Sequence, residues 1–322
     1  MRFTHAPLRF TLLAFTLIAA AAAAANPFAP TTIAVGNNPA QIAVNSVTNR
    51  IYVANLTDNT VSVIDGSSNT VVDTVSVGLV PEVVGVNPTT NMIYVANSQG
   101  DSVSVIDGST NTVVATIPNT ASTFLAVNAA TNTIYVGEQL NSAVNVINGS
   151  TNTSVATISL PGSNPGPIVA NAATNRVYVS ITDAHSLAVI DGSTNTVVTT
   201  VPFPSSGAPS WLTADFGQKR VYGIDVNRKA VYVFNTGTNT FKTTVDLSSF
   251  KSPYEGAVLP THELVVSNYN GGSLIRINPQ TLAVDGTWGN GRGPSGIAVN
   301  PVTNTMYVSD TFSNIVTVIR LK

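Results

Sequence analysis

Side chains with recognised catalytic or metal-binding chemistry are scarce in this sequence. It has no cysteine, which excludes disulfides, thiolate metal sites and a cysteine nucleophile. Neither a Gly-x-Ser-x-Gly elbow nor the ligand spacing of a zinc site occurs. Beyond the first ten residues the histidines are His185 and His262, and His185 is a candidate general base. A histidine in a surface loop without a catalytic partner is the simpler interpretation of His185.

Two glutamates and several aromatic residues are stronger candidates for a site. With nearby carbonyl oxygens, Glu82 and Glu255 could hold Ca²⁺ or Mg²⁺, because these hard cations take oxygen ligands. The other candidates supply aromatic faces, an amide, an imidazole and a guanidinium: Phe124, Trp211, Tyr254, Gln41, His185 and Arg292. Such a set suits a sugar or an extended peptide. The alternative for Phe124 and Trp211 is packing between structural elements.

A repeat of about 42 residues must bring these residues together. The stretch Ile51–Asn55 recurs as Ile93–Asn97, with looser copies further along the chain. The second position of the motif falls at residues 52, 94, 135, 178, 222, 265 and 307. The copy around Val265 departs most, because it lacks the tyrosine. Seven units fill the chain from residue 26 to residue 322 and leave no room for another domain.

Each unit reads as four short strands, here called A to D, separated by turns. In the second unit they are Pro81–Val86, Met92–Asn97, Ser102–Ile106 and Thr112–Ile117. Each run is rich in Val, Ile and Tyr and is bounded by Asn, Asp, Gly or Pro. This pattern predicts an all-β, seven-bladed β-propeller of four-stranded antiparallel blades.

The two ends of the repeat predict how the ring closes. Ile315–Lys322 matches a C strand, so the last unit lacks its D strand. Thr31–Gly36 resembles a D strand but has no A, B or C strand before it. We therefore expect the N-terminal strand to complete the last blade, which removes exposed sheet edges.

These repeats resemble the YVTN family of β-propeller proteins, through Tyr-Val-Ala-Asn at residues 52–55 and 94–97. The resemblance covers residues 26–322. The family is similar to bacterial periplasmic propellers and to archaeal surface-layer proteins. It implies a propeller fold and export. It brings no shared catalytic motif.

The first 25 residues have the layout of a secretory signal peptide. Arg2 and Arg9 form a basic head, Phe10–Ala25 is apolar, and Ala23–Ala25 supplies the small residues of a cleavage site. We expect cleavage before Asn26 and a periplasmic, cell-surface or secreted protein without a membrane span. An uncleaved anchor is the competing interpretation, although the apolar run is short for a span.

Alignment of the seven A strands predicts where the candidate residues lie. Gln41, Glu82, Phe124, Trp211, Tyr254 and Glu255 fall at the starts of A strands, which surround one mouth of the central channel. The variable B–C loops and D–A connections lie on this face and add His185 and Arg292. Variable loops on a rigid scaffold are a usual place for binding.

The leading hypothesis is therefore an exported, non-catalytic, monomeric scaffold that binds a protein, peptide or glycan at this mouth, without a cofactor. The alternative is a Ca²⁺- or Mg²⁺-assisted lyase or lactone hydrolase using Glu82 and Glu255, so catalysis remains open. Nucleic acid is disfavoured, because charged residues make up 9% of the chain and the net charge is −2.

Overall fold

The computed structural model describes residues 30–118, 124–289 and 291–321. The predicted signal peptide, residues 1–25, and the predicted mature start at Asn26 lie outside this range. Within it, no helix is long and apolar enough to cross a membrane. Its helices are three short 3₁₀ turns, η1 (Gln139–Asn141), η2 (Pro204–Ser206) and η3 (Tyr269–Gly271).

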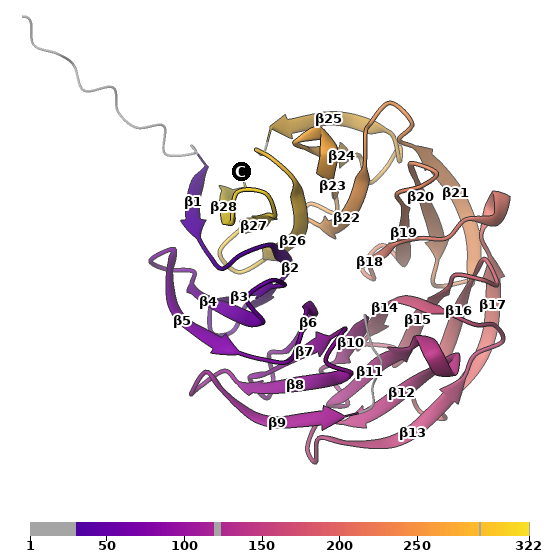
Figure 1. Cartoon of the computed structure of the whole chain (residues 1–322). Helices are drawn as coiled ribbons and strands as arrows, with labels where there is room; N and C mark the ends of the chain where they lie inside the picture. The colour runs from indigo at the N-terminus through magenta and orange to yellow at the C-terminus, as the bar shows by residue number, and fades with distance from the viewer. Residues whose placement is uncertain (1–29, 119–123, 290, 322) are drawn as a thin grey trace, which may run out of the picture.

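Seven four-stranded antiparallel sheets stand around a central axis, which confirms the predicted propeller (Figure 1). The innermost strands, A, are β2 (Pro39–Asn45), β6 (Pro81–Asn87), β10 (Leu125–Asn128), β14 (Pro165–Asn171), β18 (Trp211–Asp215), β22 (Pro253–Val258) and β26 (Pro294–Asn300). The B strands are β3 (Arg50–Asn55), β7 (Met92–Asn97), β11 (Thr133–Glu138), β15 (Arg176–Ile181), β19 (Arg220–Asp225), β23 (Leu264–Asn268) and β27 (Thr305–Asp310). The C strands are β4 (Thr60–Asp65), β8 (Ser102–Asp107), β12 (Ala143–Asn148), β16 (Ser186–Asp191), β20 (Ala230–Asn235), β24 (Ser273–Ile277) and β28 (Ile315–Arg320). The outermost strands, D, are β5 (Thr70–Ser76), β9 (Thr112–Pro118), β13 (Thr153–Ser159), β17 (Thr196–Pro202), β21 (Thr240–Asp246), β25 (Val284–Gly289) and β1 (Thr31–Ala34).

The ring closes through the first strand, as the sequence predicts. Blades are numbered 1 to 7 from β2, so blade 7 has the order β1-β28-β27-β26. In the antiparallel pairing of β1 with β28, Thr31 lies opposite Val318 and Ala34 opposite Ile315. Ile33 is 5% exposed and packs into the seam between blades 7 and 1.

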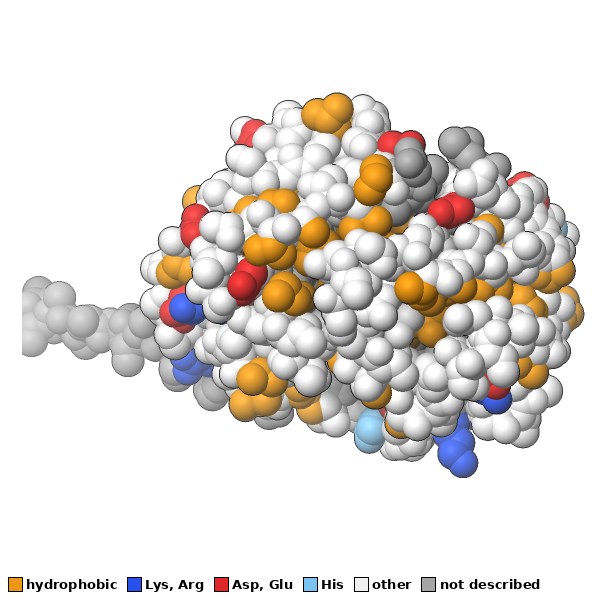
Figure 2. Space-filling view, turned by 90° about the horizontal axis from the view of Figure 1, so that it is seen from below, with side chains coloured by type: hydrophobic (Ala, Val, Ile, Leu, Met, Phe, Trp, Pro, Cys, Tyr) orange, Lys and Arg blue, Asp and Glu red, His pale blue; other side chains and the backbone are white. Residues whose placement is uncertain are grey.

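One hydrophobic cluster fills each seam between adjacent blades. The B and C strands supply most of it, since their Val and Ile side chains are buried on both faces of each sheet. Charged groups are few at the surface, and Figure 2 shows them scattered among uncharged side chains on the edge of the ring. Stability therefore comes from burial of apolar side chains and from strand pairing.

The strand-B tyrosines link neighbouring blades. Tyr94 of blade 2 is fully buried, and its hydroxyl lies beside the C–D turn of blade 3. A Cβ on Gly149 in that turn would lie 2.8 Å from this hydroxyl, which explains the glycine. Tyr307, Tyr52 and Tyr135 meet Gly66, Gly108 and Gly192 in the same way.

The seam between blades 6 and 7 is the exception. Blade 6 has Val265 where the other blades have tyrosine, and blade 7 has no C–D turn because its D strand is β1. Blade 6 thus lacks the tyrosine at the seam where blade 7 lacks the C–D turn that a tyrosine would contact. A cavity of about 620 Å³ lies there, lined by Pro30, Leu259, Arg276, Trp288, Ile319 and Leu321.

Candidate functional site

A cavity of about 320 Å³ lies at one mouth of the central channel. Six of the eight predicted site residues line it: Gln41, Glu82, Phe124, Trp211, Tyr254 and Glu255. They come from the first residues of the A strands of blades 1, 2, 5 and 6 and from the residue before β10 in blade 3. Ser210, Tyr269, Ser295 and Thr311 add polar groups.

Bulges at the starts of β2, β6 and β22 aim Gln41, Glu82, Tyr254 and Glu255 into the cavity. In blade 6, Pro253 pairs with Asn268 and Gly256 with Val266, so Tyr254 and Glu255 oppose the single residue Ser267. The Ser267 hydroxyl accepts a hydrogen bond from the Glu255 amide at 3.0 Å, which holds the bulge. Similar shifts occur after Pro39, Pro81, Pro165 and Pro294. A bulge re-aims a side chain without breaking the sheet.

Glu255 is the most buried acid of the site, at 3% exposed. Oε1 accepts one long hydrogen bond, 3.4 Å, from the backbone N–H of Ile297 in the next blade. Burial raises the pKa of Glu255 well above its usual value of 4.5, because a low-dielectric surrounding disfavours the charged form.

Glu82 faces the same cavity from blade 2 and is half-buried. Its Oε2 is buried and has no hydrogen-bond partner among the described residues. Burial raises the pKa of Glu82 too, partly opposed by the Ser98 hydroxyl. Buried carboxyl oxygens without a donor are costly, so this cavity has unused acceptor capacity.

Aromatic side chains form the walls. Trp211 packs against the clusters of seams 2–3 and 5–6, and Phe124 against those of seams 2–3 and 3–4. Both are partly buried, so they pack between blades and also line the cavity. This unites the two interpretations that the sequence offers for them.

A row of exposed rings continues from the mouth onto the rim. Tyr254 packs against Tyr269 in a tilted arrangement with ring centroids 5.6 Å apart, and Tyr269 packs against Phe312 in the same way at 5.1 Å. Tyr254 is 44% and Phe312 61% exposed. Burial, with the nearby carboxyls of Glu255 and Glu82, raises the pKa of Tyr254 to about 12, so its hydroxyl stays neutral. Sequence reasoning missed Tyr269 and Phe312, whose only signal is their place in the variable B–C loops.

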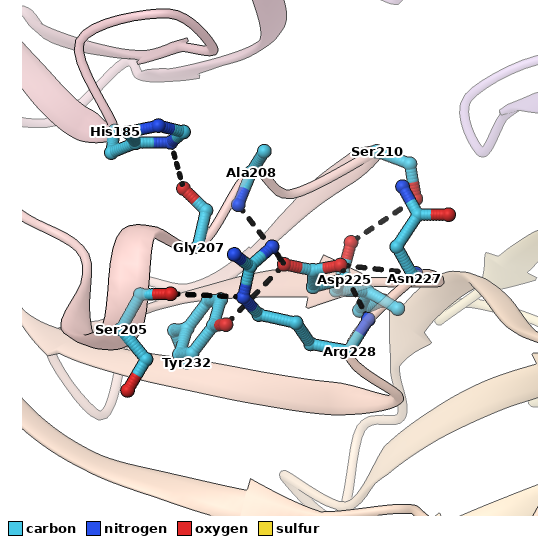
Figure 3. A network of polar contacts seen from close by, with 10 residues as sticks. His185, Ser205, Gly207, Ala208, Ser210, Asp225, Asn227, Arg228 and Tyr232 are labelled. Atoms are coloured by element: carbon cyan, nitrogen blue, oxygen red, sulfur yellow. Dashed lines mark hydrogen bonds and ion pairs between the residues drawn. The ribbon is translucent and has the colours of Figure 1, made fainter.

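His185 and Arg292 do not line the cavity. The His185 Nδ1 lies 3.2 Å from the carbonyl oxygen of Gly207 (Figure 3). The backbone N–H of Arg292 donates to Asp310 Oδ2 at 2.7 Å, and its side chain is exposed. Both residues thus belong to the loops around the mouth.

A buried aspartate, Asp225, holds together the two loops at the mouth end of blade 5. Asp225 accepts hydrogen bonds from the backbone N–H groups of Ala208, Asn227 and Arg228, at 2.9 to 3.0 Å (Figure 3). The Arg228 Nε donates to the Ser205 carbonyl at 3.0 Å. This network ties the connection before Trp211 to the following B–C loop and so fixes one wall of the cavity.

On the opposite face, His262 pairs with buried Asp215 at 2.9 Å. In other blades the same place holds an asparagine pair, such as Asn87 Nδ2 donating to Asn132 Oδ1 at 2.7 Å. The pair of His262 with Asp215 is therefore a structural link between blades, in the place of the asparagine pair. Within the described ranges, no group of three or more His, Cys, Asp or Glu could hold a metal ion.

Comparisons with known proteins support the fold. No family model matches the chain, so the YVTN resemblance rests on the repeat residues. Over 61 residues the chain is 41% identical to the PE-PGRS family protein PE_PGRS18 of Mycobacterium tuberculosis (strain ATCC 25618 / H37Rv). That match spans 19% of this chain and 13% of the relative.

Solved structures match almost the whole chain. Hydrazine synthase from Kuenenia stuttgartiensis superposes with a TM-score of 0.79 at 19% identity, covering 88% of this chain and 96% of that one. The β-propeller domain of Cps50 (Swd1) from Myceliophteria thermophila gives 0.77 at 11% identity, covering 91% and 98%. At these identities the likeness concerns the fold, because propellers carry unrelated functions.

Proposed function

We propose that the chain is an exported, non-catalytic β-propeller scaffold that binds a protein, peptide or glycan at the channel mouth. The observation that carries this is the cavity lined by Trp211, Tyr254, Glu82 and Glu255, on the face with variable loops. Its aromatic walls supply apolar area and its unused acceptors supply specificity. The proposal includes membership of the YVTN family and removal of residues 1–25 on export.

The test is a screen of the purified protein against a displayed peptide library and a glycan array. Trp211→Ala and Tyr254→Ala should each weaken a captured ligand by at least tenfold, as truncation of a central aromatic anchor does (about 1.4 kcal/mol or more). Trp288→Ala is the matched control, because Trp288 lines the other cavity. Equal binding by all three variants would place the ligand elsewhere and refute the proposal.

The second candidate is a Ca²⁺- or Mg²⁺-assisted lyase or lactone hydrolase at the same mouth. The orphan Glu82 Oε2 beside buried Glu255 is the observation that favours it. A bound ion would raise the melting temperature by mass action. A saturable rise with either ion, lost in Glu82→Ala, would favour this candidate and justify a screen of lactones.

A further inference from the structure

Two kinds of side chain favour a negative electrostatic potential in the cavity at the mouth. Its lining includes the carboxyl groups of Glu82 and Glu255. Its walls are the aromatic rings Phe124, Trp211, Tyr254 and Tyr269, whose faces carry negative potential. None of the residues that line it is Lys, Arg or His, so no cation of its lining neutralises this potential.

The donors around the two acids leave part of their acceptor capacity unused, and a ligand could fill it. Glu82 Oε2 has no hydrogen-bond partner within the described part of the chain, and Glu255 has a 3.4 Å contact from Ile297. A neutral sugar would donate hydroxyl groups but would leave the two acids to repel each other once ionised. A divalent ion takes six or more oxygen ligands, so it would have to draw on groups such as Gln41 and Ser295 besides the two carboxyl groups, and it would leave the aromatic faces unused.

An alkylammonium group satisfies both features together. It has three donors for the carboxyl oxygens and is attracted to the faces of Trp and Tyr within about 6 Å. The volume, about 320 Å³, is at the lower end of ligand pockets. It suits one side chain better than an oligosaccharide.

We propose that this mouth binds the ammonium group of a lysine side chain presented by a protein or peptide. Glu82 and Glu255 would accept its hydrogen bonds, and Trp211 and Tyr254 would enclose its methylene stem. This inference rests on the proposed function, because it names the ligand group of the same site.

Binding of the cation is coupled to release of a proton. The titratable side chains that line the cavity with Glu255 are Glu82, Tyr254 and Tyr269. Burial holds the pKa of both glutamates above the usual value, and an entering cation favours their ionised forms. Affinity for the ammonium probe therefore rises with pH until these acids are ionised in the free protein.

The experiment follows the fluorescence of Trp211 in a Trp288→Phe background, which removes the other tryptophan. The probes are Nα-acetyl-lysine methylamide, its analogue without the amino group, Nα-acetyl-norleucine methylamide, glucosamine and maltotriose. The lysine probe should bind at least about tenfold more tightly than the norleucine probe, since the stem is shared and the charge is not. Glu82→Gln and Glu255→Gln should each remove most of this preference, and Glu263→Gln on the opposite face should not.

The outcomes separate the two proposals. Equal binding of the lysine and norleucine probes refutes the ammonium site and leaves the mouth as a binding site. Tighter binding of glucosamine or maltotriose than of the lysine probe overturns the assignment to lysine and indicates a glycan. If no probe binds, the ammonium inference is wrong. The proposed function then stands or falls with the response of captured ligands to Trp211→Ala. The probe comparison uses native glutamates, so it holds even if a Gln variant misfolds.

Discussion

Glu255 lowers the stability of the fold because its carboxyl group is buried, and the same burial leaves that group available to a ligand. It replaces small or uncharged residues at the starts of most other A strands, and the bulge before Gly256 turns its carboxyl toward the channel. Burying an acid without a strong donor costs free energy. At this site the buried acid lowers stability and supplies a hydrogen-bond acceptor at the mouth.

The stability cost has a definite pH dependence. At pH values below 4.5 the Glu255 carboxyl is neutral in the folded and unfolded chain. As the pH rises through the raised pKa of the folded state, the unfolded chain already carries the charge, so the free energy of unfolding falls. The slope from this group is at most about 1.4 kcal/mol per pH unit.

Glu255→Gln should remove that slope and make the variant more stable than the native protein near neutral pH. Urea denaturation between about pH 4 and about pH 8 measures it. Glu263→Gln, which loses a partly buried ion pair with Arg276, should keep the slope that Glu255 gives the native protein. A native-like slope in Glu255→Gln would show that the acid is ionised when folded.

At the scale of the blade, the strand-B tyrosine and the glycine of the next C–D turn form one unit of packing. The pair occurs at four seams, as Tyr307–Gly66, Tyr52–Gly108, Tyr94–Gly149 and Tyr135–Gly192, and at the seam of blades 6 and 7 both the tyrosine and the C–D turn are absent. The weak copy of the motif in blade 6 is thus explained by its neighbour in space. Divergence of the repeat alone would not predict which blade lacks the tyrosine.

Val265→Tyr should therefore be tolerated, because residues that pack in one cluster with Val265, among them Leu259 and Trp288, line the cavity of about 620 Å³ and leave room for a larger side chain. We expect the free energy of unfolding to stay within about 1 kcal/mol of the native value or to rise. Val266→Tyr, one residue along, points into the filled seam of blades 5 and 6 and should cost more than about 2 kcal/mol. Urea denaturation measures the free energy of unfolding of both variants. Equal losses would contradict the explanation that blade 6 lacks the tyrosine because blade 7 lacks the turn.

Sequence reasoning reached the elements more easily than the site. The strands of blade 2 agree with their predicted bounds within a residue, since turn residues recur in every unit. The bulges were not predicted, because they add a residue to one strand without changing its apolar pattern. His185 and Arg292 were placed on the right face, but loop position does not give distance from the axis, and both lie outside the cavity.

For the whole molecule, a single short strand completes the last blade. β1 contributes four residues, and Ile33 is its buried side chain. Its cluster joins blade 7 to blade 1, so a defect there weakens the ring rather than one blade. The pairing with β28 also covers a sheet edge that would otherwise invite association.

Ile33→Ala should lower the free energy of unfolding by about 2 to 4 kcal/mol, the usual cost of truncating a buried isoleucine. Thr32→Ala, on the exposed side of the same strand, should change it by less than about 0.5 kcal/mol. Urea denaturation compares the two. Indistinguishable midpoints would mean that the ring holds without this strand.

The pairing of β1 with β28 also orders events during synthesis. The first strand of the ring leaves the ribosome long before its partner, so six blades can form while the closing contact is still missing. Such long-range contacts form late, because the chain between them must first be ordered. A chain whose synthesis stops before β28 would leave β1 unpaired and the last blade incomplete. Proteases would cleave such a chain more readily than the closed ring.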